Sequence, residues 1–168
     1  MPTPQEIYEA YLLNSPDGER HIEVVTISHS KLSQTYHITP TPEPVAVTFE
    51  TGGDVVPMPV NLNVEKSQSR GDLDEQFNFN ISDIDGTLND EADRIPLDDE
   101  EPLVVTYRGF MVSDTSAPCE GPFFLEGVSM TKSTDGSVTI AAQSPSLVVN
   151  RTGELYTYER FPMLRGFL

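Results

Sequence analysis

QFNFNIS, at Gln76–Ser82, is the stretch that decides the fold class of this chain. Its apolar residues, Phe77, Phe79 and Ile81, alternate with glutamine and asparagine. Successive side chains of a strand point to opposite faces of a sheet. The alternation therefore predicts a strand with one face against a hydrophobic core and the other face in water.

Runs rich in β-branched and aromatic residues lie on both sides of this stretch, separated by clusters of proline, glycine, serine and aspartate. Asp135-Gly136, between the last two runs, is a strong signal for a hairpin turn. We therefore expect the last runs to form a meander of consecutive strands. The further predicted strands cover residues 21–28, 36–38, 45–51, 58–65, 103–112, 123–131 and 137–143.

Two short helices are also expected. Thr3 and Glu6 have the spacing of a capping box with Pro4 at the first helical position, so a helix should begin there. A second helix is predicted over residues 83–95, because its apolar residues are spaced by four, four and three and Pro96 would end it.

The length of 168 residues fits one domain with a single core, and 37% hydrophobic residues are enough to build that core. We predict a mainly β fold with one or two short helices, arranged as an antiparallel β-sandwich or a split barrel. The β-rich domain with its N-terminal helix should cover residues 1–154.

Residues 155–168 differ from the rest of the chain, because they are aromatic, apolar and basic where an ordinary tail is polar and frayed. We call them the C-terminal arm. Such an arm either packs on its own domain or inserts into a neighbouring molecule, and the sequence leaves both open. Its candidate interface residues are Tyr156, Tyr158, Arg160, Phe161, Pro162, Leu164, Arg165 and Phe167.

The charge balance restricts the partners. The chain has 27 acidic and 10 basic residues, which gives a formal net charge of -17. Binding to nucleic acid or to anionic lipid requires a positive surface, so neither partner is expected. No stretch approaches the roughly 18 consecutive apolar residues of a membrane span, and the first residues lack the pattern of a signal peptide. We expect a protein that is made in the cytoplasm and does not bind membranes.

One motif suggests an enzyme. Residues 82–88 read like the D-x-D-G-T signature of haloacid-dehalogenase-type phosphotransferases, in which Asp83 would be the nucleophile and Asp85 the acid. That chemistry needs a carboxylate at the end of a buried parallel strand, followed by alternating helices and strands. The flanking sequence predicts an alternating strand before the motif and consecutive strands after it. A magnesium-dependent phosphatase is therefore the weaker alternative.

The histidines and the single cysteine give no site either. His21, His29 and His37 are spaced by eight and do not form a zinc-binding pattern, so we expect them at the surface or at strand edges. Cys119 cannot form an internal disulfide and should be a half-buried residue. We predict no catalytic residue, no metal and no cofactor, and hence a protein that is not an enzyme.

The order of these features resembles a family of short tail proteins of long-tailed bacteriophages that is known only as a domain of unknown function. Each shared motif is short, and residues 40–59 depart from the pattern because they hold extra prolines. The most distinctive similarity is the ending at residues 158–167, YERFPMLRGF. The other similar stretches are the opening helix with Tyr8 and Leu12, the strand at residues 21–27, the alternation at residues 77–85 and the strand entry at residues 121–123.

This resemblance implies a structural virion protein at the distal end of the tail. The expected role is a baseplate ring subunit that connects the tail tube to the tail tip. Its expected partners are further copies of itself in a ring, for which a hexamer is predicted, the tail tube protein, the tail-tip hub protein and the tape measure. A tail-assembly factor that is absent from the finished virion is the other alternative.

Overall fold

A computed structural model describes residues 3–14, 17–66, 76–82, 86–95, 101–133 and 136–145, with the backbone alone at residues 87–89. The mainly β prediction is confirmed, since ten strands and two helices make up this part of the chain. The helices are α1 (Pro4–Asn14) and α2 (Thr87–Ala92). The strands are β1 (His21–Ser28), β2 (Tyr36–Thr39), β3 (Val47–Thr48), β4 (Asp54–Val55), β5 (Met58–Pro59), β6 (Asn61–Lys66), β7 (Gln76–Ser82), β8 (Val104–Met111), β9 (Glu120–Lys132) and β10 (Ser137–Gln143).

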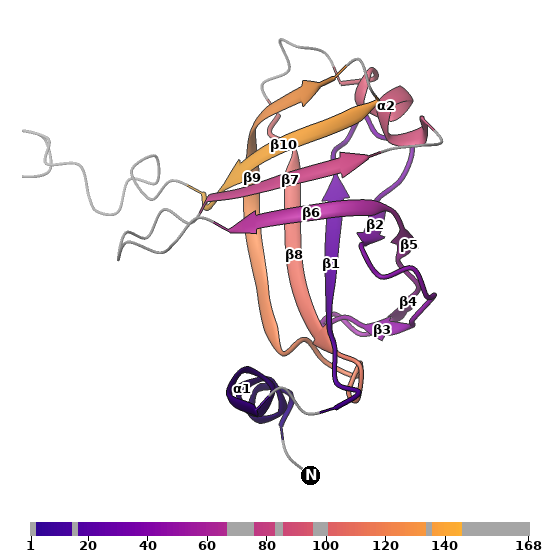
Figure 1. Cartoon of the computed structure of the whole chain (residues 1–168). Coiled ribbons are helices and arrows are strands. Elements are labelled where there is room, and N and C mark those ends of the chain that lie inside the picture. Colours follow the sequence, from indigo (N-terminus) through magenta and orange to yellow (C-terminus); the bar gives the residue numbers. More distant parts are fainter. Residues whose placement is uncertain are drawn as a thin grey trace, which may run out of the picture.

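Eight of these strands form one sheet with the order β5-β2-β1-β8-β9-β10-β7-β6. The sheet curls strongly, so that β10, β7 and β6 cross in front of β8 and β1 (Figure 1). Its two outermost strands, β5 and β6, are separated in sequence by Val60 alone, and the Val60 amide donates a hydrogen bond to the Thr39 carbonyl at 2.9 Å. The two ends of the curled sheet are therefore joined by the chain itself.

The predicted meander is confirmed, because β8, β9 and β10 follow one another and pair antiparallel. The sheet as a whole is mixed rather than antiparallel. β5 pairs parallel to β2, because residues 40–57 carry the chain back before β5 begins. Parallel neighbours need such a crossover connection. What the structure shows is one curled mixed sheet, so the sandwich or split-barrel arrangement stays a prediction.

Hydrophobic residues pack on both faces of the sheet. The main core lies on the concave face and includes Val25, Phe79, Val105 and Tyr107. A smaller cluster of Ile22, Val24, Val47 and Phe110 lies on the other face of β1 and β8, beneath the segment that contains β3. Strand β7 shows the predicted alternation, with Phe77, Phe79 and Ile81 buried and its asparagines exposed. Strand β8, which has a core on each face, is buried at seven of its eight residues.

Three predicted elements differ from the structure. The strand expected at residues 45–51 is reduced to β3, which pairs with β4 in a separate two-stranded sheet. The strand expected at residues 58–65 is interrupted at Val60, where the chain passes from one end of the sheet to the other. The second helix is confined to Thr87–Ala92, since only these residues of 86–95 keep helical hydrogen bonding.

The opening helix and its cap are confirmed. The Thr3 amide donates to Glu6 Oε2 at 2.8 Å, and the Glu6 amide donates to Thr3 Oγ1 at 3.3 Å. These two bonds satisfy amides that a helix N-terminus leaves without a partner. No helix in the described ranges is long and apolar enough to cross a membrane.

Candidate functional site

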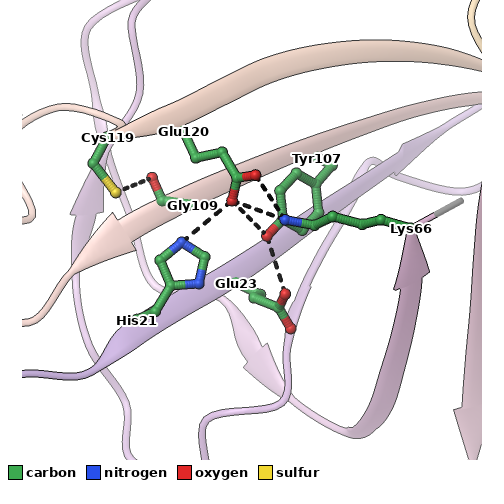
Figure 2. Close-up of polar contacts among 7 residues, drawn as sticks. All are labelled: His21, Glu23, Lys66, Tyr107, Gly109, Cys119 and Glu120. Atoms are coloured by element: carbon green, nitrogen blue, oxygen red, sulfur yellow. Dashed lines mark hydrogen bonds and ion pairs between the residues drawn. The ribbon is translucent and has the colours of Figure 1, made fainter. Parts of the chain in front are cut away.

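Five polar side chains meet on the concave face of the sheet, at the end of the sheet near α1. They are His21 and Glu23 of β1, Lys66 of β6, Tyr107 of β8 and Glu120 of β9, and we call them the polar cluster (Figure 2). The aromatic core continues directly beneath them, because the Tyr107 ring packs against Phe77 with 5.6 Å between centroids. The cluster therefore forms the polar end of the main core.

The register of the strands explains why these side chains meet. Glu23 lies opposite Gly109, and Gly109 lies opposite Glu120, so the three residues form one row across β1, β8 and β9. Because the middle residue of the row is a glycine, a space remains between the two carboxylates. A Cβ atom on Gly109 would lie 2.3 Å from His21 Nε2 and 3.0 Å from Glu120 Cβ. The absence of a side chain at Gly109 thus leaves room for the imidazole of His21.

Tyr107 connects the two carboxylates. Its hydroxyl lies 3.0 Å from Glu23 Oε1 and 3.2 Å from Glu120 Oε2. A phenol has a single proton, so it donates to one of them at a time. Burial, and then the two negative charges, raise the pKa of Tyr107 far above its ordinary value. The hydroxyl is therefore a permanent donor and not a base.

Lys66 supplies the positive charge. Its Nζ atom lies 2.7 Å and 2.8 Å from the two carboxylate oxygens of Glu120, and it lies 4.3 Å from the centroid of the Tyr107 ring. An ammonium over the face of an aromatic ring is attracted by the ring quadrupole. Lys66 thereby fixes the end of β6 to β8 and β9, on the opposite wall of the curled sheet.

His21 is the least satisfied member of the cluster. Its Nε2 atom is buried without a hydrogen-bond partner among the described residues, and the nearest carboxylate oxygen, Glu120 Oε2, is 3.5 Å away. Burial lowers the pKa of His21, although the charges of Glu120 and Glu23 act in the opposite direction. The prediction that the histidines lie at the surface or at strand edges is wrong for His21, because β1 turns it toward the concave face.

Helix α1 covers this end of the sheet. The Tyr8 ring lies over His21 with 5.2 Å between the ring centroids, and burial together with Glu120 raises the pKa of Tyr8. No residue of α1 is fully buried. Tyr8 therefore connects the helix to the polar cluster, and the contact of the helix with the sheet is shallow.

A second buried charge lies on the opposite face of β8. Arg108 donates to Glu50 through Nε at 2.9 Å and through Nη2 at 2.6 Å, and Nη1 donates to Thr26 Oγ1 at 3.2 Å. Its guanidinium lies 4.4 Å from the centroid of the Phe49 ring. We call Arg108 and Glu50 the outer pair. The hydrogen bonds from Arg108 lower the pKa of Glu50.

Cys119 is next to the polar cluster but is unreactive. Its thiol donates to the Gly109 carbonyl at 3.3 Å, and burial raises its pKa to about 11. The thiolate is the nucleophilic form of cysteine, so a thiol with this pKa is a poor nucleophile. Cys119 was expected to be half-buried, and the structure shows it to be buried.

The cluster is built to hold strands together. Nearly all of its donors and acceptors bind one another, and they join β1, β6, β8 and β9. Across the described ranges, no three His, Cys, Asp or Glu residues are grouped so that they could hold a metal ion. A metal site at the cluster therefore has no support from its geometry.

None of the site residues proposed from the sequence belongs to the described part of the chain. The eight candidate interface residues of the C-terminal arm and the motif residues Asp83 and Asp85 lie outside the described residues. The strand before the motif, β7, pairs antiparallel with β10 on one side and with β6 on the other. It is not the buried parallel strand that the phosphotransferase chemistry needs.

Sequence reasoning missed the polar cluster. Lys66 and Glu120 are 54 residues apart, and Glu23 and Tyr107 are 84 residues apart. One signal was present, since His21 and Glu23 share a strand face with Val25 and Ile27. Polar residues on a core-facing register call for a buried partner.

The fold and the cluster define a class of protein: a mainly β domain with one curled sheet, closed at one end by a helix. A comparison with protein-family models matches residues 8–145 to a family described as a domain of unknown function, DUF1833. The match spans most of the chain, which therefore belongs to this family. A search of curated proteins found no match. The predicted membership of a family of unknown function is confirmed, while the tail-tip role stays a prediction.

Proposed function

We propose that this protein is a structural component of a bacteriophage tail. It would form a ring at the distal end of the tail, where it connects the tail tube to the tail-tip hub. The tail tube protein, the hub protein and the tape measure would be its neighbours in the virion. The observation that carries the proposal is the exposure of large apolar side chains at separate places on a strongly acidic domain.

One such place is the outer face of β8 and β9. Phe124 and Val128 are 57% and 62% exposed, and Val104 lies on the neighbouring strand, where its direct partner is Glu126. Another is the end of α1, where Leu13 is 82% exposed beside Leu12. Single exposed apolar residues are ordinary, but adjacent ones usually mark surfaces that bind other proteins. Two separate surfaces of this kind suit a subunit with more than one neighbour.

The construction of the domain also supports a structural role. Lys66, Tyr107 and the two carboxylates form hydrogen bonds with one another rather than pointing into an open cleft. The outer pair in the same way fixes the segment around Glu50 to β8. These links stiffen the domain across its layers. A subunit that transmits load between a tube and a tip needs such a rigid body.

The net charge of -17 is compatible with this role. Like charges keep free subunits soluble and apart until neighbours cover the apolar surfaces. An acidic surface that lines a ring would also repel DNA during its passage. The C-terminal arm is basic, so it is the part of the chain best suited to approach the acidic body of another copy.

The first test is the mass of the purified protein in solution, with and without residues 155–168, at low and at moderate salt. A ring subunit should form a multimer that depends on the arm. Salt should favour the multimer, because it screens repulsion between the acidic bodies. A monomer under all these conditions, together with absence from the particle, would contradict the proposal.

Analysis of purified virions by mass spectrometry separates the two tail-related alternatives. A ring subunit is retained in the finished particle in a fixed ratio to the tail-tip hub. An assembly factor is required for tail formation but is missing from the particle. Detection in stoichiometric amount therefore decides between these roles.

A further inference from the structure

A pocket of about 240 Å³ opens beside the first residues of β1. Its walls are mainly apolar and include Ile22, Pro42, Val45 and Val112. Arg20 and Glu43 line it as well and form an exposed ion pair, with Arg20 Nη2 at 3.2 Å from Glu43 Oε2. The pocket is thus a small apolar hollow with two opposite charges beside it.

The size of the pocket indicates what it holds. Sites for small-molecule ligands usually measure about 300–1,000 Å³. A pocket of 240 Å³ is below this range and suits one large side chain. In protein interfaces, aromatic side chains in such pockets carry most of the binding energy, and arginine is enriched beside them. The geometry therefore fits a protein segment with an aromatic anchor and a nearby arginine.

The C-terminal arm has this composition. We propose that the pocket receives Tyr158 from the arm of a second copy, while Arg160 of the same arm binds Glu43. In an extended segment, residues two apart point to the same side, so both side chains can reach the pocket and its rim together. The phenol would lie with its ring between the apolar walls and its hydroxyl beside Arg20. This inference rests on the proposed ring and names the surface that receives the arm.

Charge complementarity favours this occupant. Residues 1–145 hold 7 basic and 25 acidic side chains, whereas residues 155–168 hold two arginines and one glutamate. The surface beside the pocket follows the acidic majority, since Glu19 accepts a hydrogen bond from the amide of Ser113, the neighbour of Val112. The ion pair of Arg20 and Glu43 is exposed and weak, so Glu43 can share its carboxylate with a second arginine.

The arrangement also explains how a ring could close. The pocket lies beside the start of β1, whereas the chain leaves the described domain after β10, which is separated from β1 in the sheet by β8 and β9. When the arm of one copy binds the pocket of the next copy, two different surfaces of the chain are in contact, and such a contact is head-to-tail. Head-to-tail contacts form rings when the rotation between copies closes.

A mixing experiment with full-length chains tests the proposal. Thr41→Trp fills the pocket, since Thr41 lines it, and Tyr158→Ala removes the anchor. Each change should raise the protein concentration for half-assembly at least about tenfold, as expected for a central interface anchor. An equimolar mixture of the two variants should give dimers, because the intact arm of one fits the intact pocket of the other. Sedimentation velocity measures all three samples.

Glu43→Lys is a second variant, which leaves the pocket open and reverses the charge that Arg160 would bind. It should weaken assembly, whereas Glu65→Lys, the same change on the exposed face of β6, should leave assembly unchanged. Circular dichroism confirms that each variant is folded. Assembly of the Thr41→Trp and Glu43→Lys proteins at wild-type concentration would overturn the pocket as receiver while leaving the ring in place.

Cross-linking identifies which copy supplies the arm. Thr41→Cys and Thr157→Cys chains, mixed under mild oxidation, should form a disulfide-linked heterodimer, because Thr157→Cys keeps the Tyr158 anchor, and the buried Cys119 should not compete. An intrachain disulfide in the doubly substituted chain, without a heterodimer in the mixture, would show docking within one molecule and overturn the proposal. A monomeric wild type, together with substituted chains that form neither disulfide, would overturn this inference, and absence of the protein from the virion would then overturn the ring as well.

Discussion

The two faces of β8 hold buried charge in different ways. On the convex face, the outer pair is a bidentate ion pair, in which Nε and Nη2 of Arg108 donate to the two carboxylate oxygens of Glu50. On the concave face, two carboxylates share one phenol, a single ammonium binds Glu120, and His21 Nε2 has no hydrogen-bond partner among the described residues. The outer pair needs only one further bond, from Arg108 to Thr26, whereas the polar cluster depends on several strands.

This difference suggests that a buried charge and its partner can be replaced together by apolar residues only where the charge has few partners. The outer pair joins one residue of β8 to one residue beyond β3. The polar cluster joins side chains from β1, β6, β8 and β9, so we expect that replacing two of its members leaves other members without a partner. We expect substitutions on the two faces to differ in size and, above all, in whether a second substitution restores stability.

The largest effect is expected at the outer pair. The side chain of Arg108 is 7% exposed and that of Glu50 is 31% exposed, so Glu50→Ala leaves a buried guanidinium without its counter-ion. The free energy of unfolding should fall by about 3 kcal/mol, as for other broken buried pairs. Urea unfolding, followed by circular dichroism, measures it.

The matched double variant sharpens this result. Arg108→Met with Glu50→Leu removes both charges and keeps apolar volume, so it should recover most of the lost stability. A double variant that is as unstable as Glu50→Ala alone would mean that the outer pair is not an independent unit.

The next largest effect is expected in the polar cluster. Tyr107→Phe removes the hydroxyl that lies between Glu23 and Glu120 and leaves two carboxylates with one donor fewer, at a cost of about 2 kcal/mol. Tyr36→Phe is the control, because among the described residues its hydroxyl forms a hydrogen bond with Ser33 Oγ alone, at 3.1 Å. A loss at Tyr107 no greater than the loss at Tyr36 would contradict the special role of the cluster.

Gly109→Ala should be somewhat milder, at about 1.5 kcal/mol, because the added methyl group requires His21 to move. The nearest obstacle is the imidazole Nε2 atom, at 2.3 Å from the new Cβ. The double variant Gly109→Ala with His21→Ala should therefore destabilise less than the sum of the single changes. Strict additivity in thermal unfolding would show that the imidazole is not what the glycine accommodates.

The smallest effect is a dependence of stability on pH. Burial, and then the charge of Arg108, lower the pKa of His37, and burial lowers the pKa of His21. A histidine whose folded pKa lies below the unfolded value of about 6.5 takes up its proton more readily when unfolded. Its stabilising contribution is complete above that pH and is lost as the pH falls toward the folded pKa.

The free energy of unfolding should consequently decrease between pH 7 and pH 5. His37→Gln keeps a hydrogen-bonding group near Thr26, which lies 3.0 Å from His37 Nδ1, and should flatten the curve. An unchanged slope in this variant would assign the pH dependence to other groups.

The sequence predicts the strands whose signal is local. Strand β7 and the meander β8-β9-β10 follow from alternation and from the turn at residues 133–136. The interruption at Val60 was not predictable in this way. Residues 58–65 form a regular alternating run, and only the curl of the whole sheet requires the chain to pass there from β5 to β6.

The polar cluster could not be predicted from the sequence for the same reason, because it depends on how the whole sheet curls. Its members carry no motif spacing, and the contact between Lys66 and Glu120 exists only once β6 crosses the opposite wall of the sheet. Glu23 in a strand of apolar neighbours was the one available hint. It indicated that a partner must exist, but nothing in the sequence identified Tyr107 as that partner.

The position of β1 and β10 within the sheet has a mechanical consequence. Helix α1 leads into β1, the segment after Gln143 follows β10, and both strands are hydrogen-bonded on each side. Tension applied through these two connections would act on inner strands. Withdrawing either strand requires two ladders of hydrogen bonds to break together, whereas an edge strand is peeled from one. The domain should therefore resist pulling along its chain better than its small size suggests.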